Sequence, residues 1–280
     1  MSQLDRVPEY RDLTPDEWLA GYFNGFDGID SGWGQIPTRG DASRKWKNLD
    51  YLRLRDAILH LLAPGPGKRI LDVGCSTGAT MIYCGLQGAT VSGQDLDVKS
   101  VEQANLSLRR FGIEGEAVVG DATKLQFKDN TFDAVISCDF VEHIDESTKV
   151  SMLREARRVL KPGCPLLTKT PNLAYQQLSV NFKRLRALSR GRSPRGFVIP
   201  HTPGTADPQH IGLTTRWRFT HTLLAAGFLN YSYHYAPLRR FGPSMVMEVL
   251  STEVPLLRDL LCEDLLCCAY KPICASHFPD

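Results

Sequence analysis

A buried strand that ends in a paired-glycine loop constrains the fold of this chain more than any other feature. Residues 70–73 read Ile-Leu-Asp-Val, a short apolar run typical of a strand covered on both faces of a parallel sheet. Gly74 and Gly78 follow, and glycine permits backbone angles and a close ligand approach that a Cβ would block. The pattern predicts a strand, a tight loop and a helix, with a ligand beyond the carboxyl end of the strand.

The spacing of the two glycines bears on the class of ligand. A dinucleotide loop has the pattern G-x-G-x-x-G, whereas this loop has Ser76 between Gly74 and Gly78 and carries Asp72 just ahead. An acid at that place suits a ligand with an ammonium group better than a pyrophosphate, which needs bare N–H donors. Taken alone, the strand and loop leave a dinucleotide and another adenosyl ligand equally open.

Two further acids follow predicted strands in the same way. Asp95 ends the β-prone run 89–95, and Asp121 follows the run 116–119. Because parallel strands end at one edge of a sheet, these acids and Asp72 could contact different parts of one ligand. A lone acid at such a place is more often a helix N-cap or loop residue, so only the joint spacing favours a ligand site.

These segments resemble the motifs of class I S-adenosylmethionine-dependent methyltransferases. The resemblance extends over about residues 68–172 and rests, in order, on Leu71–Gly78, Gly93–Asp95, Gly120–Ala122 and Phe132–Ile136. It implies an α/β fold with a doubly wound, mostly parallel, Rossmann-like sheet that binds S-adenosyl-L-methionine. The cofactor-binding residues it implies are Asp72, Gly74 and Gly78 at the methionine part, Asp95 at the ribose hydroxyls, and Asp121 with Ala122 at the adenine. The chain departs from the family pattern at Ser76, where a middle glycine is common.

Polar side chains after the fourth predicted strand are the candidates for chemistry. His143 lies shortly after the apolar run 134–136, so it is expected at the same sheet edge as the cofactor. Methyl transfer from a sulfonium requires an aligned acceptor and removal of its proton, and an imidazole suits the role of general base. The plainer interpretation of His143 is a structural histidine at a helix start.

A second resemblance covers Asp139, Glu142 and His143. Their D-x-x-E-H spacing is similar to the E-x-x-E-H element of ubiquinone-pathway O-methyltransferases and small-RNA 2′-O-methyltransferases, where it implies a divalent metal such as Mg²⁺. The RNA enzymes have a further histidine downstream, for which His210 is the best-placed match and His201 the second. The resemblance thus implies His143 and His210 as catalytic residues, and as metal ligands Asp139, Glu142, His143 and His210. An aspartate replaces the first glutamate, and the plainer interpretation of His210 is a loop histidine.

A basic segment interrupts the alternation of strands and helices. No Asp or Glu occurs between residues 156 and 206, while the stretch 183–195 contains Lys183, Arg184, Arg186, Arg190, Arg192 and Arg195. It could hold an anionic acceptor, contact acidic lipid or bind RNA phosphate, and the plainer interpretation is a solvated insertion. Ubiquinone-pathway relatives have a membrane-associating insertion in a similar place, which favours peripheral contact of residues 183–195 with acidic membrane lipid.

Length and composition fit one large core. The 280 residues are 42% hydrophobic and carry a net charge of only +2. We expect an N-terminal lid or arm at 1–50 and a methyltransferase domain at 51–280, with a substrate-side insertion at 172–212. A helix at 215–226 and strands near 228–235 and 265–270 would complete the sheet.

The remaining sequence signals concern the cysteines and the location of the chain. The eight cysteines lack the spacing of a zinc ribbon or a disulfide framework, and we expect most to be reduced core residues. Without a signal-peptide pattern or an apolar run of about 18 residues, a cytoplasmic protein is expected.

The expected function is therefore S-adenosylmethionine-dependent methylation of a small molecule, at a hydroxyl oxygen. One alternative is an RNA 2′-O-methyltransferase, against which stand the near-neutral charge and the lack of a recognisable RNA-binding module. Another is a methyltransferase-like binding protein without catalysis. The sequence leaves the acceptor, the need for a metal and the oligomeric state open.

Overall fold

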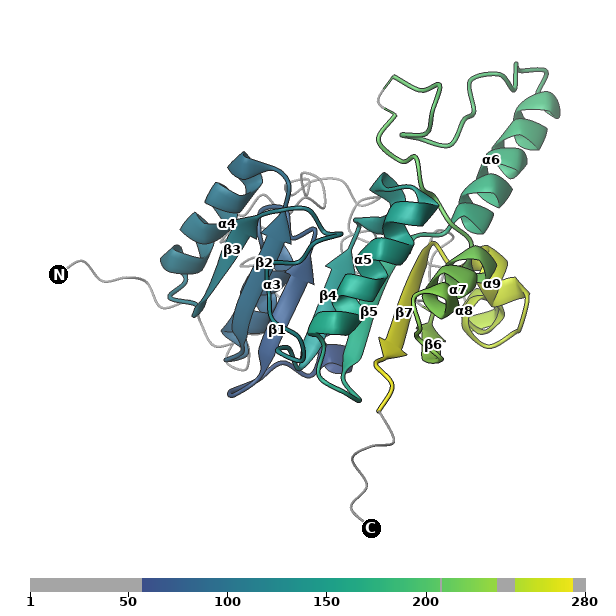
Figure 1. Ribbon diagram of the computed structural model, residues 1–280. Coiled ribbons are helices and arrows are strands. Elements are labelled where there is room, and N and C mark those ends of the chain that lie inside the picture. Colours follow the sequence, from purple (N-terminus) through teal and green to yellow (C-terminus); the bar gives the residue numbers. More distant parts are fainter. Residues whose placement is uncertain (1–56, 207, 236–244, 274–280) are drawn as a thin grey trace, which may run out of the picture.

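A seven-stranded sheet forms the centre of the computed structural model, which describes residues 57–206, 208–235 and 245–273 (Figure 1). The strands are β1 (Arg69–Val73), β2 (Thr90–Asp95), β3 (Gly115–Val119), β4 (Ala134–Cys138), β5 (Pro165–Pro171), β6 (Asn230–His234) and β7 (Asp264–Tyr270). They lie in the order β3-β2-β1-β4-β5-β7-β6, and β7 runs antiparallel to both β5 and β6. The predicted doubly wound, mostly parallel sheet is confirmed.

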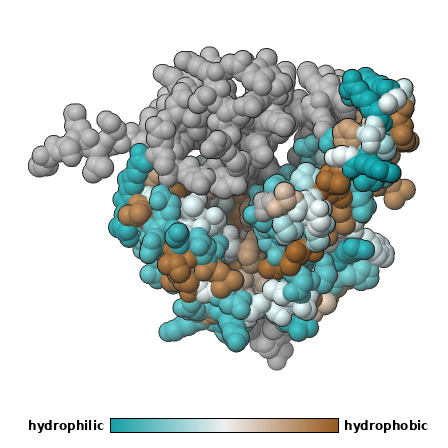
Figure 2. Space-filling model, turned by 90° about the horizontal axis from the view of Figure 1, so that it is seen from above, coloured by the Kyte–Doolittle hydropathy of each residue, from teal (hydrophilic) through white to brown (hydrophobic). Residues whose placement is uncertain are grey.

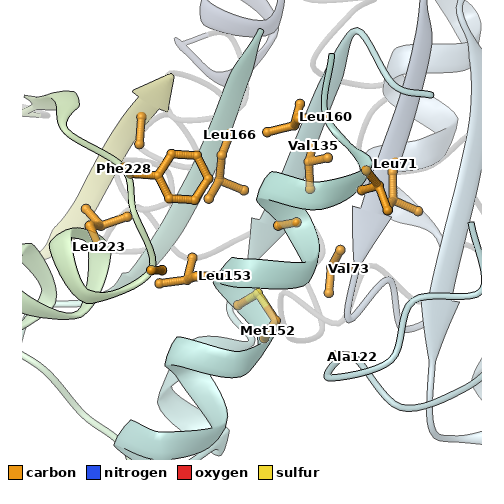
Figure 3. Close-up of a cluster of buried hydrophobic side chains, with 14 of the residues drawn as sticks. Leu71, Val73, Ala122, Val135, Met152, Leu153, Leu160, Leu166, Leu223 and Phe228 are labelled. Atoms are coloured by element: carbon orange, nitrogen blue, oxygen red, sulfur yellow. The ribbon is translucent and has the colours of Figure 1, made fainter. Parts of the chain in front are cut away.

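Helices cover both faces of the sheet because alternate strand residues point to opposite sides. One face packs against residues 57–62, α3 (Ala79–Leu86) and α4 (Val98–Arg110). The other packs against α5 (Glu146–Val159) and α7 (Arg216–Ala225), and Figure 3 shows part of this cluster between Met152, Leu153, Val135 and Leu166. The apolar runs that predicted buried strands therefore supply both halves of the core.

The predicted elements after residue 213 are also present. Thr215 caps α7 by accepting a hydrogen bond from the Arg218 N–H, and Gly227 follows the helix with a φ of +88°. The strands expected near 228–235 and 265–270 are β6 and β7. Seven cysteines among the described residues are free, and most of them are buried as expected.

The basic insertion differs from a simple loop because it begins with a helix. α6 (Leu173–Leu188) starts at Asn172, whose side chain accepts a hydrogen bond from the Ala174 N–H, and it extends beyond the carboxyl edge of the sheet (Figure 1). The chain returns to the sheet where the Leu173 N–H bonds to the Thr214 carbonyl at 2.9 Å. The remaining helical segments are η1 (Val141–His143), α8 (Met245–Thr252) and α9 (Leu257–Leu261).

Two further sequence-based expectations concern the N-terminal region and membrane-spanning helices. The predicted lid or arm at 1–50 lies outside the described residues, as does the start of the domain at residue 51. None of the described helices combines the length and the apolar character needed to cross a bilayer.

Candidate active site

The glycine loop lies where the sequence predicts it, between β1 and α3. The Gly74 N–H bonds to the Gln94 carbonyl of β2 at 2.8 Å, and Gly78 bonds back to the Cys75 carbonyl at 2.9 Å. Gly74 has a φ of +74°, and a Cβ there would lie 2.4 Å from ring atoms of Phe140. This glycine is required both by its backbone conformation and by its packing.

Ser76, at the place where the family pattern often has a glycine, has an unusual backbone conformation. It adopts a φ of +46°, in the left-handed region that non-glycine residues rarely enter. Its N–H donates to Asp95 Oδ2 at 2.8 Å, and the Asp97 N–H donates to Asp95 Oδ1 at 2.9 Å. The Asp95 carboxylate therefore joins the end of β2 to the glycine loop.

The three predicted acids lie along one edge of the sheet, at the ends of neighbouring strands. Asp72 pairs in register with Gly93 of β2, and Asp95 pairs with Val119 of β3, two residues before Asp121. Asp72 is only 4% exposed, whereas Asp95 is half-buried and Asp121 is exposed. The sequence-based prediction of their common edge is confirmed by this register.

The electrostatic states of these acids differ. Burial, aided by the charge of Asp95, raises the pKa of Asp72 to about 7. No described residue donates a hydrogen bond to the Asp72 carboxylate, so a cationic group of a ligand would stabilise its ionised form. The Thr123 N–H, in contrast, lowers the pKa of Asp121 by bonding to its carboxylate at 2.8 Å.

Sequence reasoning missed Gln94, which connects two parts of the cofactor site. Its side chain is 1% exposed, and Nε2 donates to the Asp121 carbonyl at 2.8 Å. Ala122, the other residue assigned to the adenine, is buried and packs into the core cluster on the α5 side. The available signal was a glutamine inside an otherwise buried strand, a place where an unpaired amide would be costly.

The second half of the site brings together residues that are distant in sequence. Glu142 and His143 belong to η1 after β4, and His210 belongs to the segment that returns from the insertion. One possible ligand atom from each of these three residues lies within 4.8 Å of the others. The rings of His143 and His210 are 5.0 Å apart, and His201 lies beyond His210 at 5.1 Å.

Asp139 is not a member of this group. It has a φ of +52°, and its carboxylate forms a 2.6 Å ion pair with the buried Lys169 of β5. The four-residue metal set implied by the family resemblance is thus gathered here only in part, because Lys169 binds the aspartate instead. Lys169 also lies 3.5 Å from Asp264 of β7.

Backbone bonds hold the returning segment on η1. The Gly212 N–H donates to the Glu142 carbonyl at 2.8 Å, and His143 Nδ1 lies 3.2 Å from the Gln209 carbonyl. The ammonium group of the fully buried Lys149, on α5, donates a hydrogen bond to the Gly212 carbonyl. These contacts determine the position of His210 relative to η1.

Glu142 is a buried carboxyl with one hydroxyl partner. It is 1% exposed, and the Thr170 hydroxyl donates to its Oε2 at 2.9 Å. Burial and, second, the charge of Asp139 raise its pKa to about 7. The site therefore combines a buried carboxyl and two imidazoles, the kinds of side chain that serve as general bases.

The fold is that of class I S-adenosylmethionine-dependent methyltransferases, and the glycine loop with its three acids is the candidate cofactor half of the site. The strand order, the glycine loop after β1 and the acids at the carboxyl ends of β1, β2 and β3 are the features that agree with this class. Comparison with known proteins agrees, because residues 70–163 match a family described as "Methyltransferase domain".

Three curated relatives differ in the atom that their names say is methylated. The chain is 33% identical over 122 residues to norajmaline N-methyltransferase of Rauvolfia serpentina, covering 42% of this chain and 40% of the relative. It is 30% identical to 27-O-demethylrifamycin SV methyltransferase of Amycolatopsis mediterranei, covering 54% and 56%. It is 35% identical to a ubiquinone/menaquinone biosynthesis C-methyltransferase of Desulfotalea psychrophila, covering 53% and 58%. The matched part spans about half the length of these relatives, and the link to the ubiquinone O-methyltransferases is loose.

A solved structure has a similar fold over more of the chain than the residues that match the methyltransferase family. Magnesium protoporphyrin IX methyltransferase from Synechocystis PCC 6803, crystallised with bound SAH, matches 90% of this chain and 98% of its own with a TM-score of 0.55. The sequence identity is 17%, so this likeness concerns the fold alone.

Proposed function

We propose that this protein transfers the methyl group of S-adenosylmethionine to a hydroxyl oxygen of a small-molecule acceptor. The observation that carries the proposal is the grouping of Glu142, His143 and His210 within 4.8 Å at the edge where β4 ends. A hydroxyl must lose its proton as the oxygen is methylated, and carboxylates and imidazoles are the side chains that most often act as general bases. The relatives include N-, O- and C-methyltransferases, so the choice of oxygen rests on this site.

His143 is the proposed general base. The Gln209 carbonyl, 3.2 Å from Nδ1, favours the tautomer in which Nδ1 carries the hydrogen. That tautomer leaves the lone pair of Nε2 available for the proton of the acceptor hydroxyl. His210 is the second proposed catalytic residue, because its ring lies 5.0 Å from that of His143.

As an alternative to a histidine base, the same three residues fit a divalent metal ion, with a donor set of one carboxylate and two imidazoles. A His143 Nε2 bound to the ion could not also accept the proton. This set suits a borderline ion such as Mn²⁺, Fe²⁺, Co²⁺ or Zn²⁺ better than Mg²⁺, which prefers oxygen ligands. We infer that Glu142, His143 and His210 would hold the ion and that Asp139, paired with Lys169, would not. When bound, such an ion lowers the pKa of a coordinated hydroxyl.

The proposed membrane contact is supported by the surface of α6. Its exposed apolar side chains Leu178, Phe182 and Leu185 follow helical spacing, on the side away from the buried Val180 and Ala187. In the view from above, hydrophobic and hydrophilic side chains adjoin at the right of the molecule, where Figure 1 has α6 (Figure 2). An apolar stripe beside the cations of residues 183–195 suits a surface of acidic lipid.

The central experiment follows labelled S-adenosylmethionine into fractions of a host extract, with and without a chelator. We expect the label in a small extractable molecule, bound to oxygen, and a loss of transfer in His143→Ala and His210→Ala of about 100-fold or more. The exposed His221→Ala on α7 is the matched control. Transfer unaffected by chelator would contradict the metal proposal.

Two other outcomes would contradict the proposed function as a whole. Label in the RNA fraction would favour the RNA 2′-O-methyltransferase alternative, which draws no support from the relatives named above. Tight binding of S-adenosylmethionine without transfer to any fraction would favour a non-catalytic binding protein.

A further inference from the structure

The amide of Gln94 is fully engaged by a single loop. Nε2 donates to the carbonyls of Asp121 at 2.8 Å and Lys124 at 3.3 Å, while Oε1 accepts from the Gln126 N–H at 3.0 Å. All three partners belong to residues 120–126, here called the adenine loop. The side chain of a β2 residue thus holds both ends of this loop.

A glycine makes room for this arrangement. A Cβ on Gly120 would lie 2.5 Å from Gln126 Nε2 and 2.8 Å from Gln94 Nε2. Gln126 Nε2 in turn donates to the Val119 carbonyl at 2.7 Å, at the end of β3. Gly120 does not have a positive φ, so the glycine is needed for space and not for backbone conformation.

The backbone of Gln94 has a separate role at the other loop of the site. Its carbonyl accepts hydrogen bonds from the Gly74 and Cys75 N–H groups at 2.8 and 3.4 Å. These bonds do not depend on the side chain, so a substitution at position 94 changes the adenine loop and leaves the acceptor of the glycine loop in place.

We propose that Gln94 is a positioning residue for the adenine of S-adenosylmethionine, acting through the adenine loop. This inference rests on the proposed function and on the assignment of Asp121 and Ala122 to the adenine that the family resemblance implies. An apolar side chain would suit a buried strand position, as Val91 does on the same strand. A buried amide is stabilising only when its donors and acceptor are bonded, and here every bond goes to the adenine loop.

The test measures the binding of two ligands by titration calorimetry. S-adenosylhomocysteine contains adenine, ribose and the amino-acid part, whereas 5′-methylthioadenosine lacks the amino-acid part. In Gln94→Met, a side chain of similar length without hydrogen-bonding groups, we expect Kd to rise about tenfold for both ligands. The matched variant Asp72→Asn should weaken S-adenosylhomocysteine and change methylthioadenosine less than about twofold.

Two further variants keep the inference falsifiable if Gln94→Met does not fold. Gly120→Ala should displace the Gln94 and Gln126 amides and weaken both ligands in the same way. Gln94→Glu keeps the acceptor for the Gln126 N–H but puts a carboxylate oxygen against two carbonyls, so it should also weaken both.

The outcomes are distinct. Unchanged affinity for both ligands, or a loss for S-adenosylhomocysteine alone, would overturn the role of Gln94 while leaving the proposed function standing. Failure of the unaltered protein to bind S-adenosylhomocysteine would overturn the proposed function, and this inference with it.

Discussion

The acidic side chains of the candidate cofactor site differ in their bonding. Some form hydrogen bonds within the protein, whereas others are left to bind a ligand. Both oxygens of Asp95 accept backbone N–H bonds, from Ser76 and Asp97, yet each carboxylate oxygen has a further lone pair. The buried Asp72 has no such donor among the described residues. Asp95 therefore stabilises the loop and can still bind a ligand, whereas the ionised form of Asp72 depends on a cationic group of the ligand.

Replacing Asp95 by Ala should weaken S-adenosylmethionine about 100-fold, because two charge-assisted hydrogen bonds to the ribose would be lost. Calorimetry on the folded variant measures this loss. Asp97→Ala is the matched control: Asp97 caps α4, so its loss should cost about 1 kcal/mol of stability with little change in affinity. Equal cofactor affinity in Asp95→Ala and the unaltered protein would contradict the ribose assignment.

Asp72 should make the stability of the unliganded protein depend on pH. Its folded-state pKa of about 7 lies above its value in the unfolded chain, so its ionisation costs stability as the pH rises from about 4 to 7. Asp72→Asn removes this cost, and its advantage over the unaltered protein should grow across that window to as much as about 4 kcal/mol.

Urea unfolding at several pH values between 4 and 8 measures this difference. The corresponding substitution Glu102→Gln, at the exposed surface of α4, is the control. An advantage for Asp72→Asn that stays constant with pH would show that burial does not govern the titration of this carboxyl.

At the scale of elements, α6 presents two sides with different environments. Val180 and Ala187 are buried, while Phe182 is 57% and Leu185 is 67% exposed. The loop that follows is tied back by Arg184, whose Nε donates to the Phe197 carbonyl at 2.9 Å. The helix thus exposes its apolar stripe to solvent.

Vesicle flotation tests the proposed lipid contact of α6. The unaltered protein should float with vesicles that contain phosphatidylglycerol and not with pure phosphatidylcholine, and rising salt should weaken the binding. The double variant Phe182→Glu and Leu185→Glu should reduce binding at least about tenfold, through loss of apolar burial and added repulsion. Leu229→Glu, at an equally exposed leucine, is the control.

Two results would contradict the lipid contact. Equal flotation with neutral and acidic vesicles would remove the electrostatic part of the argument. No flotation at all would indicate another occupant of the stripe, such as residues of this chain outside the described part.

At the scale of the whole molecule, the cofactor edge connects both core clusters. β1 supplies Ile70 to one cluster and Leu71 to the other, and the glycine loop begins where β1 ends. A ligand that bridges the ends of β1, β2 and β3 should therefore stabilise the folded chain as a unit.

Saturation with S-adenosylhomocysteine should raise the free energy of unfolding by about 2.7 kcal/mol at a concentration of 100 times Kd. Thermal or urea unfolding at several ligand concentrations measures the increase. Asp95→Ala should need about 100-fold more ligand for the same effect. A midpoint that does not depend on ligand concentration would contradict binding to the folded state.

The fold could be predicted largely because its signals are local. Hydrophobic runs indicate the buried strands, and Thr215 and Gly227 delimit α7. The helix α6 was not predicted, because the cluster of basic residues favoured a solvated insertion even though Leu178, Phe182 and Leu185 follow helical spacing. Gln94 was missed for a related reason, because the partners that satisfy its amide lie in a loop some thirty residues on.

By itself the sequence determined where the glycine loop and the three acids lie, because each of them follows or ends its own strand and parallel strands end at one edge. Only the tertiary structure decided the second half. The pairing of Asp139 with Lys169 and the return of His210 to η1 depend on long-range contacts, such as the bond from the Gly212 N–H to the Glu142 carbonyl. Such contacts are specified by packing across the whole molecule, which no local pattern of residues encodes.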